Sequence, residues 1–193
     1  MRRVVIPGND ESSHRVWHSR GYLPHVDAAG LIQFVTFRLA DALPHRALAE
    51  KAGDGERSPR IDAVLDAGYG ECVLRHPGPA REVERVLLEG DGHSCRLLAW
   101  VVMPNHVHVV AEMNGGASLS KVVQQWKGVS AREINQELGG GGRLWQPEYH
   151  DRFIRDQEHL AAAVNYTHGN PVAAGLCERA EDWPLSSAHL KAW

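Results

Sequence analysis

Two histidines separated by one residue are the feature of this sequence with the clearest chemical potential. His106 and His108 lie in the segment Met103 to Val110, which reads MPNHVHVV. Successive side chains of a β-strand point to opposite faces, so both imidazoles project from one face if this segment is a strand. A lone histidine on an apolar strand is most often a core residue, but burying two imidazoles without partners is costly. The spacing therefore predicts a pair that holds one metal ion.

The residues around the histidines predict a β-hairpin. An apolar run occupies 97–102, a second follows the histidines at 109–111, and Met103-Pro104-Asn105 breaks the pattern between them. Short apolar runs bounded by a turn signal are typical of two buried strands joined by a tight connection. We therefore expect both histidines on the second strand of this hairpin.

A tyrosine and an asparagine further along the chain could complete a site. Tyr166 and Asn170 are four residues apart on a predicted helix over 156–170, so they share one face, about 6 Å apart along the helix axis. If that face packs against the histidines, Asn170 supplies an amide oxygen as a third ligand and Tyr166 directs its hydroxyl at whatever the metal holds. Two imidazoles and a neutral oxygen leave open positions on Mg²⁺ or Mn²⁺, as binding of a phosphodiester requires.

Other interpretations of the same residues remain open. Tyr166 alone fits a half-buried core position, and Asn170 before Pro171 fits the N-cap of a short helix over 171–174, although an amide oxygen with two lone pairs can both cap and ligate. A zinc hydrolase would instead use the two histidines with a third such as His150. Its nucleophile would be a metal-bound water, with Tyr166 a bystander.

The predicted elements define an α+β fold. Strand, helices, strand, strand, helix, strand and helix follow one another, which matches a ferredoxin-like βαββαβ antiparallel sheet with its helices on one face and an added C-terminal helix carrying the tyrosine. The Gly139–Gly142 run ends the fourth helix and predicts a flexible joint. The predicted ranges are strands 31–38, 97–102, 106–111 and 150–155, and helices 41–51, 59–68, 79–90, 118–138 and 156–170.

Length and composition indicate one domain with an appendage. The chain has 193 residues and is 43% hydrophobic; residues 1–29 are polar and predict an N-terminal arm, and 30–193 predict a single domain. No apolar stretch approaches the roughly 18 residues that span a bilayer, so we expect a cytoplasmic protein. The three cysteines are widely spaced and form no C-x-x-C pattern, which argues against a disulfide framework and a thiolate zinc site and favours buried thiols.

The net charge of the chain does not indicate nucleic-acid binding. Its formal net charge is −3 and its pI is near 6.4, whereas nucleic-acid-binding domains normally carry a basic footprint. Any basic surface must therefore be assembled by folding. The candidate DNA contacts are Trp126, Lys127, Arg152 and Arg155, although the tryptophan also fits the core and the arginines also fit surface pairs with neighbouring carboxylates.

Five blocks of the sequence, in their order and spacing, resemble the REP-associated tyrosine transposases, which belong to the single-tyrosine HUH (IS200-like) family. The resemblance covers about residues 20 to 190. The blocks are Pro104–His108, Trp145–Pro147, Ile154–Asp156, Tyr166 with Asn170–Val172 and Gly175-Leu176, and Trp183-Pro184 with Ser186-Ser187.

The resemblance implies a function and roles for the candidate residues. His106 and His108 fall on the metal ligands of the family, Asn170 on the third ligand, and Tyr166 on the nucleophile. The implied activity is Mg²⁺- or Mn²⁺-dependent cleavage and transfer of single-stranded DNA at palindromic repeat hairpins through a 5′-phosphotyrosine intermediate, by a monomer or a homodimer. A domesticated member that binds the hairpin but cuts poorly is the alternative, and no member of the catalytic set is missing.

Overall fold

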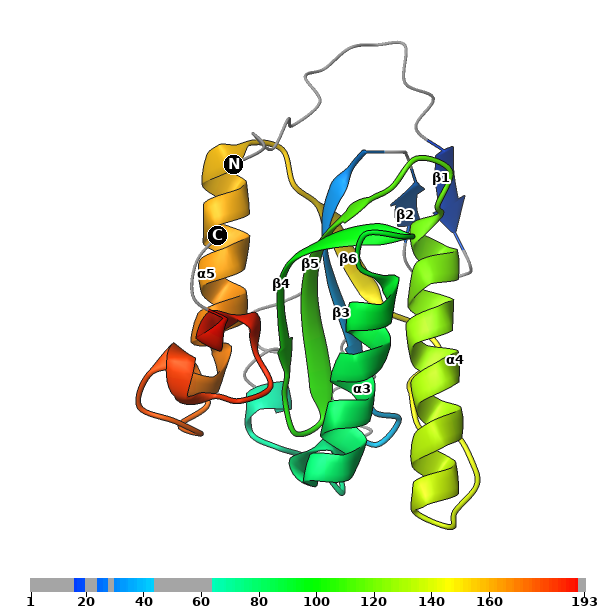
Figure 1. Cartoon of the computed structure of the whole chain (residues 1–193), viewed down its shortest axis with the longest axis vertical. Coiled ribbons are helices and arrows are strands. Elements are labelled where there is room, and N and C mark those ends of the chain that lie inside the picture. The colour runs from blue at the N-terminus through cyan, green and yellow to red at the C-terminus, as the bar shows by residue number, and fades with distance from the viewer. Residues whose placement is uncertain (1–15, 20–23, 28–29, 44–63, 191–193) are drawn as a thin grey trace.

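The computed structural model describes residues 16–19, 24–27, 30–43 and 64–190. Its centre is a sheet of four antiparallel strands, β3 (Ile32–Arg38), β4 (Cys95–Val102), β5 (His106–Met113) and β6 (His150–Phe153), in the spatial order β4-β5-β3-β6. Helix α3 (Pro77–Gly90) precedes β4, and α4 (Leu119–Glu137) links β5 to β6. This order and connectivity are those of a ferredoxin-like βαββαβ fold, so the predicted fold is confirmed (Figure 1).

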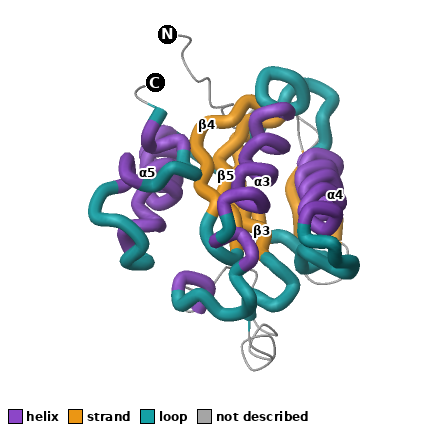
Figure 2. The backbone as a smooth tube through the Cα atoms, turned by 60° about the horizontal axis from the view of Figure 1, so that its bottom comes forward, coloured by secondary structure: helices purple, strands orange, loops and turns teal. Residues whose placement is uncertain are grey.

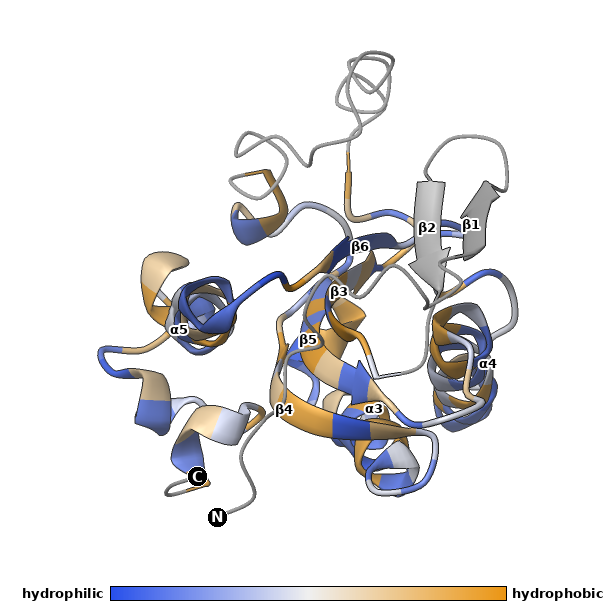
Figure 3. Ribbon diagram, turned by 90° about the horizontal axis from the view of Figure 1, so that it is seen from above, coloured by the Kyte–Doolittle hydropathy of each residue, from blue (hydrophilic) through white to orange (hydrophobic). Residues whose placement is uncertain are grey.

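The two faces of the sheet are covered by different helices. Helices α3 and α4 pack on one face, and α5 (Gln157–Ala173) lies on the other against β4 and β5 (Figures 2 and 3). On β5, the side chains of Val107 and Val109 belong to the core beneath α3 and α4. Val110 belongs to a second, smaller core that includes Ala163 of α5. Since residues two apart share a face, the two histidines of β5 lie on the α5 side.

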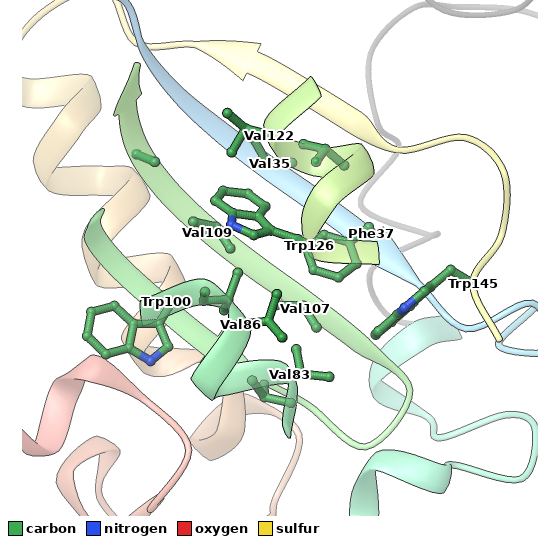
Figure 4. Close-up of a cluster of buried hydrophobic side chains, with 14 of the residues drawn as sticks. Val35, Phe37, Val83, Val86, Trp100, Val107, Val109, Val122, Trp126 and Trp145 are labelled. Atoms are coloured by element: carbon green, nitrogen blue, oxygen red, sulfur yellow. The ribbon is translucent and has the colours of Figure 1, made fainter. Parts of the chain in front are cut away.

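The larger core explains why the hairpin and the crossover helices hold together. Aromatic and β-branched side chains of the strands interdigitate with apolar side chains spaced three or four residues apart on α3 and α4 (Figure 4). Trp126 of α4 stacks on Phe37 of β3 with ring centroids 6.4 Å apart, and Trp145 meets the same phenylalanine edge-on at 4.9 Å. Residues labelled in Figure 4 are Val35, Phe37, Val83, Val86, Trp100, Val107, Val109, Val122, Trp126 and Trp145.

Local signals set the ends of the helices. Asp156 caps α5 by accepting a hydrogen bond from the backbone N–H of His159. Ser118 occupies the N-cap position of α4, but its hydroxyl pairs with the Ser120 hydroxyl instead of a backbone N–H. Helix α4 ends before the glycine run, where Gly139 has the positive φ of 62° that favours glycine.

The proposed helix break at Asn170-Pro171 is wrong. Helix α5 continues through Pro171 to Ala173, so Asn170 is an interior helical residue and caps no separate helix over 171–174. A proline removes one backbone donor, but Ala174 N still bonds to Asn170 O and Leu176 N to Pro171 O. These two bonds hold the last turn of α5 although Pro171 has no backbone N–H.

The segment after α5 returns along the edge of the sheet. Val102 N donates to Leu185 O at 2.8 Å, and Trp183 Nε1 donates to Val102 O at 3.0 Å. His168 of α5 reaches the same segment, with Nε2 2.8 Å from Ser187 Oγ. The C-terminal segment thus ties the free edge of β4 to α5.

Several smaller expectations have mixed outcomes. Within the predicted arm, β1 (Val16–Ser19) and β2 (Pro24–Asp27) form an antiparallel pair that the sequence did not indicate. The predicted helix over 41–51 begins instead as a turn at 41–43; its remainder, and the start of the helix expected from Pro59, lie outside the described residues. The division into an arm and one domain stays a prediction.

Two further expectations concern the state of the cysteines and the presence of membrane-spanning helices. All three cysteines are free; two of them are buried and Cys177 is half-buried. Among the described residues, no helix has the length and apolar content needed to cross a membrane.

Two adjacent leucines on α3 test the larger core. Leu87 is fully buried, whereas Leu88 is 43% exposed. We expect Leu87→Ala to lower the free energy of unfolding by about 2–5 kcal/mol because it leaves a cavity, and Leu88→Ala to change it by about 0.5 kcal/mol. Urea unfolding followed by circular dichroism measures both, and equal losses would contradict the packing described.

Candidate active site

The two histidines of β5 converge on one point. His106 and His108 are 1% and 0% exposed, and their Nε2 atoms lie 3.1 Å apart. The rings meet edge to face with centroids 4.7 Å apart. The prediction that both imidazoles project from one face of the strand is therefore confirmed.

Asn105 determines which nitrogen of His106 carries the proton. The Asn105 Nδ2 group donates to the carbonyls of Leu65 at 3.1 Å and Tyr69 at 3.0 Å, which fixes the orientation of the amide. Its Oδ1 is then an acceptor, 2.8 Å from His106 Nδ1. A neutral imidazole carries one N–H, so Nδ1 is the donor and Nε2 is left with its lone pair. His106 is thus held in the tautomer in which Nε2 can bind a cation.

Thr36 plays the matching role for His108. It lies directly opposite His108 in the pairing of β3 with β5, and its Oγ1 is 2.8 Å from His108 Nδ1. A hydroxyl can donate or accept. When Thr36 accepts, His108 carries its proton on Nδ1, and both Nε2 atoms then present lone pairs at the same place.

Helix α5 brings the tyrosine to this face. The Tyr166 ring meets His108 edge-on with centroids 5.4 Å apart and meets Phe34 at 5.7 Å, while Phe34 stacks on His108 at 5.4 Å. The three rings form one cluster in which Phe34 contacts both of the others. Tyr166 nonetheless stays 39% exposed, so its ring is both positioned and reachable from solvent.

Asn170 supplies a buried oxygen one helical turn from the tyrosine. Its side chain is 2% exposed, and Oδ1 has no hydrogen-bond partner among the described residues. A buried carbonyl oxygen without a partner is unfavourable and uncommon in folded proteins. Two imidazole nitrogens and such an oxygen are donors that Mg²⁺ or Mn²⁺ accepts, so the residues present fit a divalent cation.

The third-histidine site of a zinc hydrolase does not form. Thr36 of β3 lies opposite both His108 of β5 and His150 of β6, so β3 separates these two histidines by two strand spacings, about 10 Å. Across the described parts of the chain, no group of three or more histidine, cysteine, aspartate or glutamate side chains is placed to hold a metal ion.

Sequence reasoning missed two residues next to the histidines. Asp66 places Oδ1 3.8 Å from His106 Nε2, and Asn105 orients His106 as described above. Asn105 was interpreted only as part of a turn, although its place directly before His106 was visible. Asp66 is 40 positions away and carries no local motif, so only the folded structure brings it to the site.

Of the two arginines proposed as DNA contacts, Arg152 lies on the histidine face of the sheet. Arg152 is exposed and opposite Phe34 in the pairing of β3 with β6, which puts it on the histidine face of the sheet. Arg155 is exposed just beyond β6, with its guanidinium carbon 5.5 Å from the Phe153 ring centroid. Arg152 therefore offers a cation on the histidine face at the β6 edge of the sheet.

Trp126 and Lys127 are placed elsewhere. Trp126 is 2% exposed in the core, and Lys127 belongs to α4 on the opposite side of the sheet. The Lys127 ammonium donates to the carbonyls of Gln146 and Pro147, each at 2.7 Å. Burial lowers the pKa of Lys127 to about 8, with Glu148 opposing and Arg38 adding to the shift. Neither of these two candidate DNA contacts therefore lies on the histidine face with Arg152.

Comparison with known proteins points to one family. Residues 82–170 match the model of the family described as transposase IS200-like, a span that contains both histidines, Tyr166 and Asn170. The resemblance to the IS200-like transposases that the motifs indicate is therefore confirmed. Transposases of this family are DNA-cleaving enzymes.

Two individual proteins also resemble this chain, one in sequence and one in structure. A Haemophilus influenzae protein named as a REP-associated tyrosine transposase is 26% identical over 102 residues, which are 48% of this chain and 58% of that protein. The match thus spans less than two thirds of the relative's length. A solved structure of a REP-associated tyrosine transposase bound to a REP hairpin is 21% identical, covers 90% of this chain and 82% of its own, and has a TM-score of 0.53. At 21% identity, this structural similarity is evidence for the fold alone.

The role of Asn105 is testable against a second asparagine. Asn105→Ala removes the partners of three buried groups, the Leu65 and Tyr69 carbonyls and His106 Nδ1–H, and we expect it to lower the free energy of unfolding by about 2–4 kcal/mol. Asn114 makes one exposed bond, from Nδ2 to His93 O, so Asn114→Ala is expected to lower it by about 1 kcal/mol or less. Urea unfolding measures both, and similar losses would contradict the assigned network.

Proposed function

We propose that this chain is a metal-dependent endonuclease and strand transferase for single-stranded DNA, acting at palindromic repeat hairpins through a 5′-phosphotyrosine intermediate. The observation that carries the proposal is the meeting of the Tyr166 ring with the histidine pair on one side of the sheet. The family match supports a transposase, and the relatives' names support a REP hairpin as the substrate.

The proposed metal ligands are His106, His108 and Asn170. A bound Mg²⁺ or Mn²⁺ would polarise the scissile phosphate and favour the phenoxide form of tyrosine, whose ordinary pKa is about 10. Before any ion arrives, the protein keeps the His106 Nε2 lone pair in place through Asn105 and positions the His108 ring through Thr36, whose hydroxyl can accept from Nδ1 when an ion takes the His108 Nε2 lone pair.

The proposed chemical step is an attack by Tyr166 on the DNA backbone. The Tyr166 oxygen forms a bond to the scissile phosphorus while the bond from phosphorus to the 3′ oxygen breaks. The leaving oxygen gains a proton and becomes a free 3′-hydroxyl, and the phenolic proton passes to water or to the phosphate. Attack of a 3′-hydroxyl from another strand on the phosphotyrosine reverses these steps and joins the strands.

His168, two residues from Tyr166, does not serve as the base in this scheme. Its Nε2 lies 2.8 Å from Ser187 Oγ in the C-terminal segment, on the far side of the helix from the tyrosine. Burial lowers the pKa of His168, so the ring is neutral at pH 7. Its role in this proposal is to fasten α5, which carries the nucleophile.

A hairpin with a single-stranded flank suits this site. Tyr166 is partly exposed beside the buried histidine pair, and a flexible single strand can bend its phosphate into such a site without melting a duplex. Arg152 and Arg155 are the proposed phosphate contacts along the approach. Trp126 and Lys127 drop out of the proposed interface because of their positions.

Covalent capture tests the nucleophile. With single-stranded hairpin DNA from the repeats flanking the gene and Mn²⁺, the wild type is expected to form a protein–DNA adduct that survives denaturation. Tyr166→Phe should bind the same DNA and form no adduct, since it lacks the attacking oxygen. Denaturing gel electrophoresis with labelled DNA measures both. Tyr149→Phe, altered on the opposite face of the sheet, is the matched control and should form the adduct normally.

Two outcomes would decide against this proposal. Cleavage by Tyr166→Phe at an undiminished rate would make water the nucleophile. Tight hairpin binding by the wild type with no cleavage under any tested metal would favour the alternative of a binding protein that no longer cuts.

The salt dependence of binding tests the arginines. Each phosphate contact contributes about one unit to the slope of log K against log salt concentration. We expect Arg152→Ala to weaken hairpin binding and to reduce that slope by about 0.7–0.9, measured by fluorescence anisotropy. Arg132→Ala removes the same charge from α4, on the opposite face, and should change neither value. Equal effects of the two substitutions would place the DNA elsewhere.

A further inference from the structure

A carboxylate from the connection between β3 and α3 stands beside the histidine pair. Asp66 Oδ1 lies 3.8 Å from His106 Nε2, and the Asp66 side chain is 22% exposed. This nitrogen is the one that Asn105 leaves with a lone pair, and it is 3.1 Å from His108 Nε2. The carboxylate therefore faces the metal-binding nitrogen and not the proton-carrying one.

The position of Asp66 is fixed by the same amide that orients His106. Asn105 Nδ2 donates to the carbonyls of Leu65 and Tyr69, which flank Asp66 in sequence. Leu65 is 1% exposed and packs in the larger core. Asp66 is thus held between an anchored neighbour and an anchored carbonyl, both tied to the residue directly before His106.

The two imidazole nitrogens have the spacing of neighbouring ligands of one ion, and the carboxylate oxygen lies just beyond that spacing. Neighbouring ligands of an octahedral ion with bonds of about 2.1 Å stand about 3.0 Å apart. The two Nε2 atoms are 3.1 Å apart, whereas Asp66 Oδ1 is 3.8 Å from His106 Nε2. As it stands the carboxylate is therefore not placed to complete a three-residue metal site, and it has to move toward the ion when the ion binds. The imidazoles and the Asn170 amide are all neutral, so a carboxylate would add the first negative charge to the set.

We propose that Asp66 is a direct ligand of the same divalent cation as His106, His108 and Asn170, an inference that rests on the metal site of the proposed function. The resulting set has two nitrogens and two oxygens, one of them charged. Hard cations such as Mn²⁺ and Mg²⁺ favour carboxylate oxygens, and their affinity rises with ligand charge. Asp66 thereby makes the site selective for a hard ion while DNA is absent.

Titration of the full chain with Mn²⁺, without DNA, tests this assignment. Electron paramagnetic resonance of free Mn²⁺ gives the dissociation constant. Asp66→Ala is expected to weaken binding about tenfold or more, and Asp66→Asn less, because an amide oxygen can still coordinate. Glu71→Gln removes the same charge from an exposed position in the same connection and should stay within about twofold of the wild type. Solvent-proton relaxation should show about one additional water on Mn²⁺ bound to Asp66→Ala.

The outcomes separate this inference from the proposed function. If wild type and His106→Ala differ in Mn²⁺ affinity but Asp66→Ala matches Glu71→Gln, Asp66 is no ligand and the histidine site stands. If the wild type binds no Mn²⁺, or His106→Ala binds it normally, the metal site fails and the Asp66 assignment fails with it. Melting temperatures without metal, expected to be equal for the wild type and Asp66→Ala, show that the fold is not the cause.

Discussion

The alternation of side chains along β5 is the constraint on which the rest of the molecule depends. Val107, Val109 and their neighbours on that face build the core under α3 and α4, while His106 and His108 face α5. Because the strand period is two, a register shift of one residue would bury the valines on the wrong side and turn both imidazoles into the large core. The packing that stabilises the fold thus also determines which face of the sheet carries the histidines.

A network of hydrogen bonds orients the histidine rings, which packing alone cannot do. The core places the imidazoles, Asn105 fixes the proton of His106 on Nδ1, and Thr36 holds the His108 ring through a bond to its Nδ1. Asn105 also binds the connection that carries Asp66. One amide therefore joins the hairpin, the preceding connection and the tautomer of a histidine, so its loss would disturb all three.

Much of this arrangement was predictable from sequence because its signals are local. The β-branched runs around His106 fixed the hairpin, and the four-residue interval between Tyr166 and Asn170 fixed their common helical face. The break proposed at Pro171 was wrong because tertiary packing and later carbonyl bonds carry the helix past one missing donor. Asp66 escaped prediction because its partner is 40 residues away. The position of Lys127 was not predictable because spacing alone does not say which side of a sheet a helix covers.

The attachment of α5 has a consequence for how the proposed site would come apart. This helix packs on a small cluster that includes Ile32, Val110 and Ala163, and the C-terminal segment fastens it to β4 through Ser187. The histidines sit on the separate and much larger body of the sheet. Local opening of α5 would remove Tyr166 and Asn170 together and leave the histidine pair in place. Heating should therefore separate Tyr166 from the histidine pair before the sheet melts, with amide hydrogens of α5 exchanging sooner than those of β5.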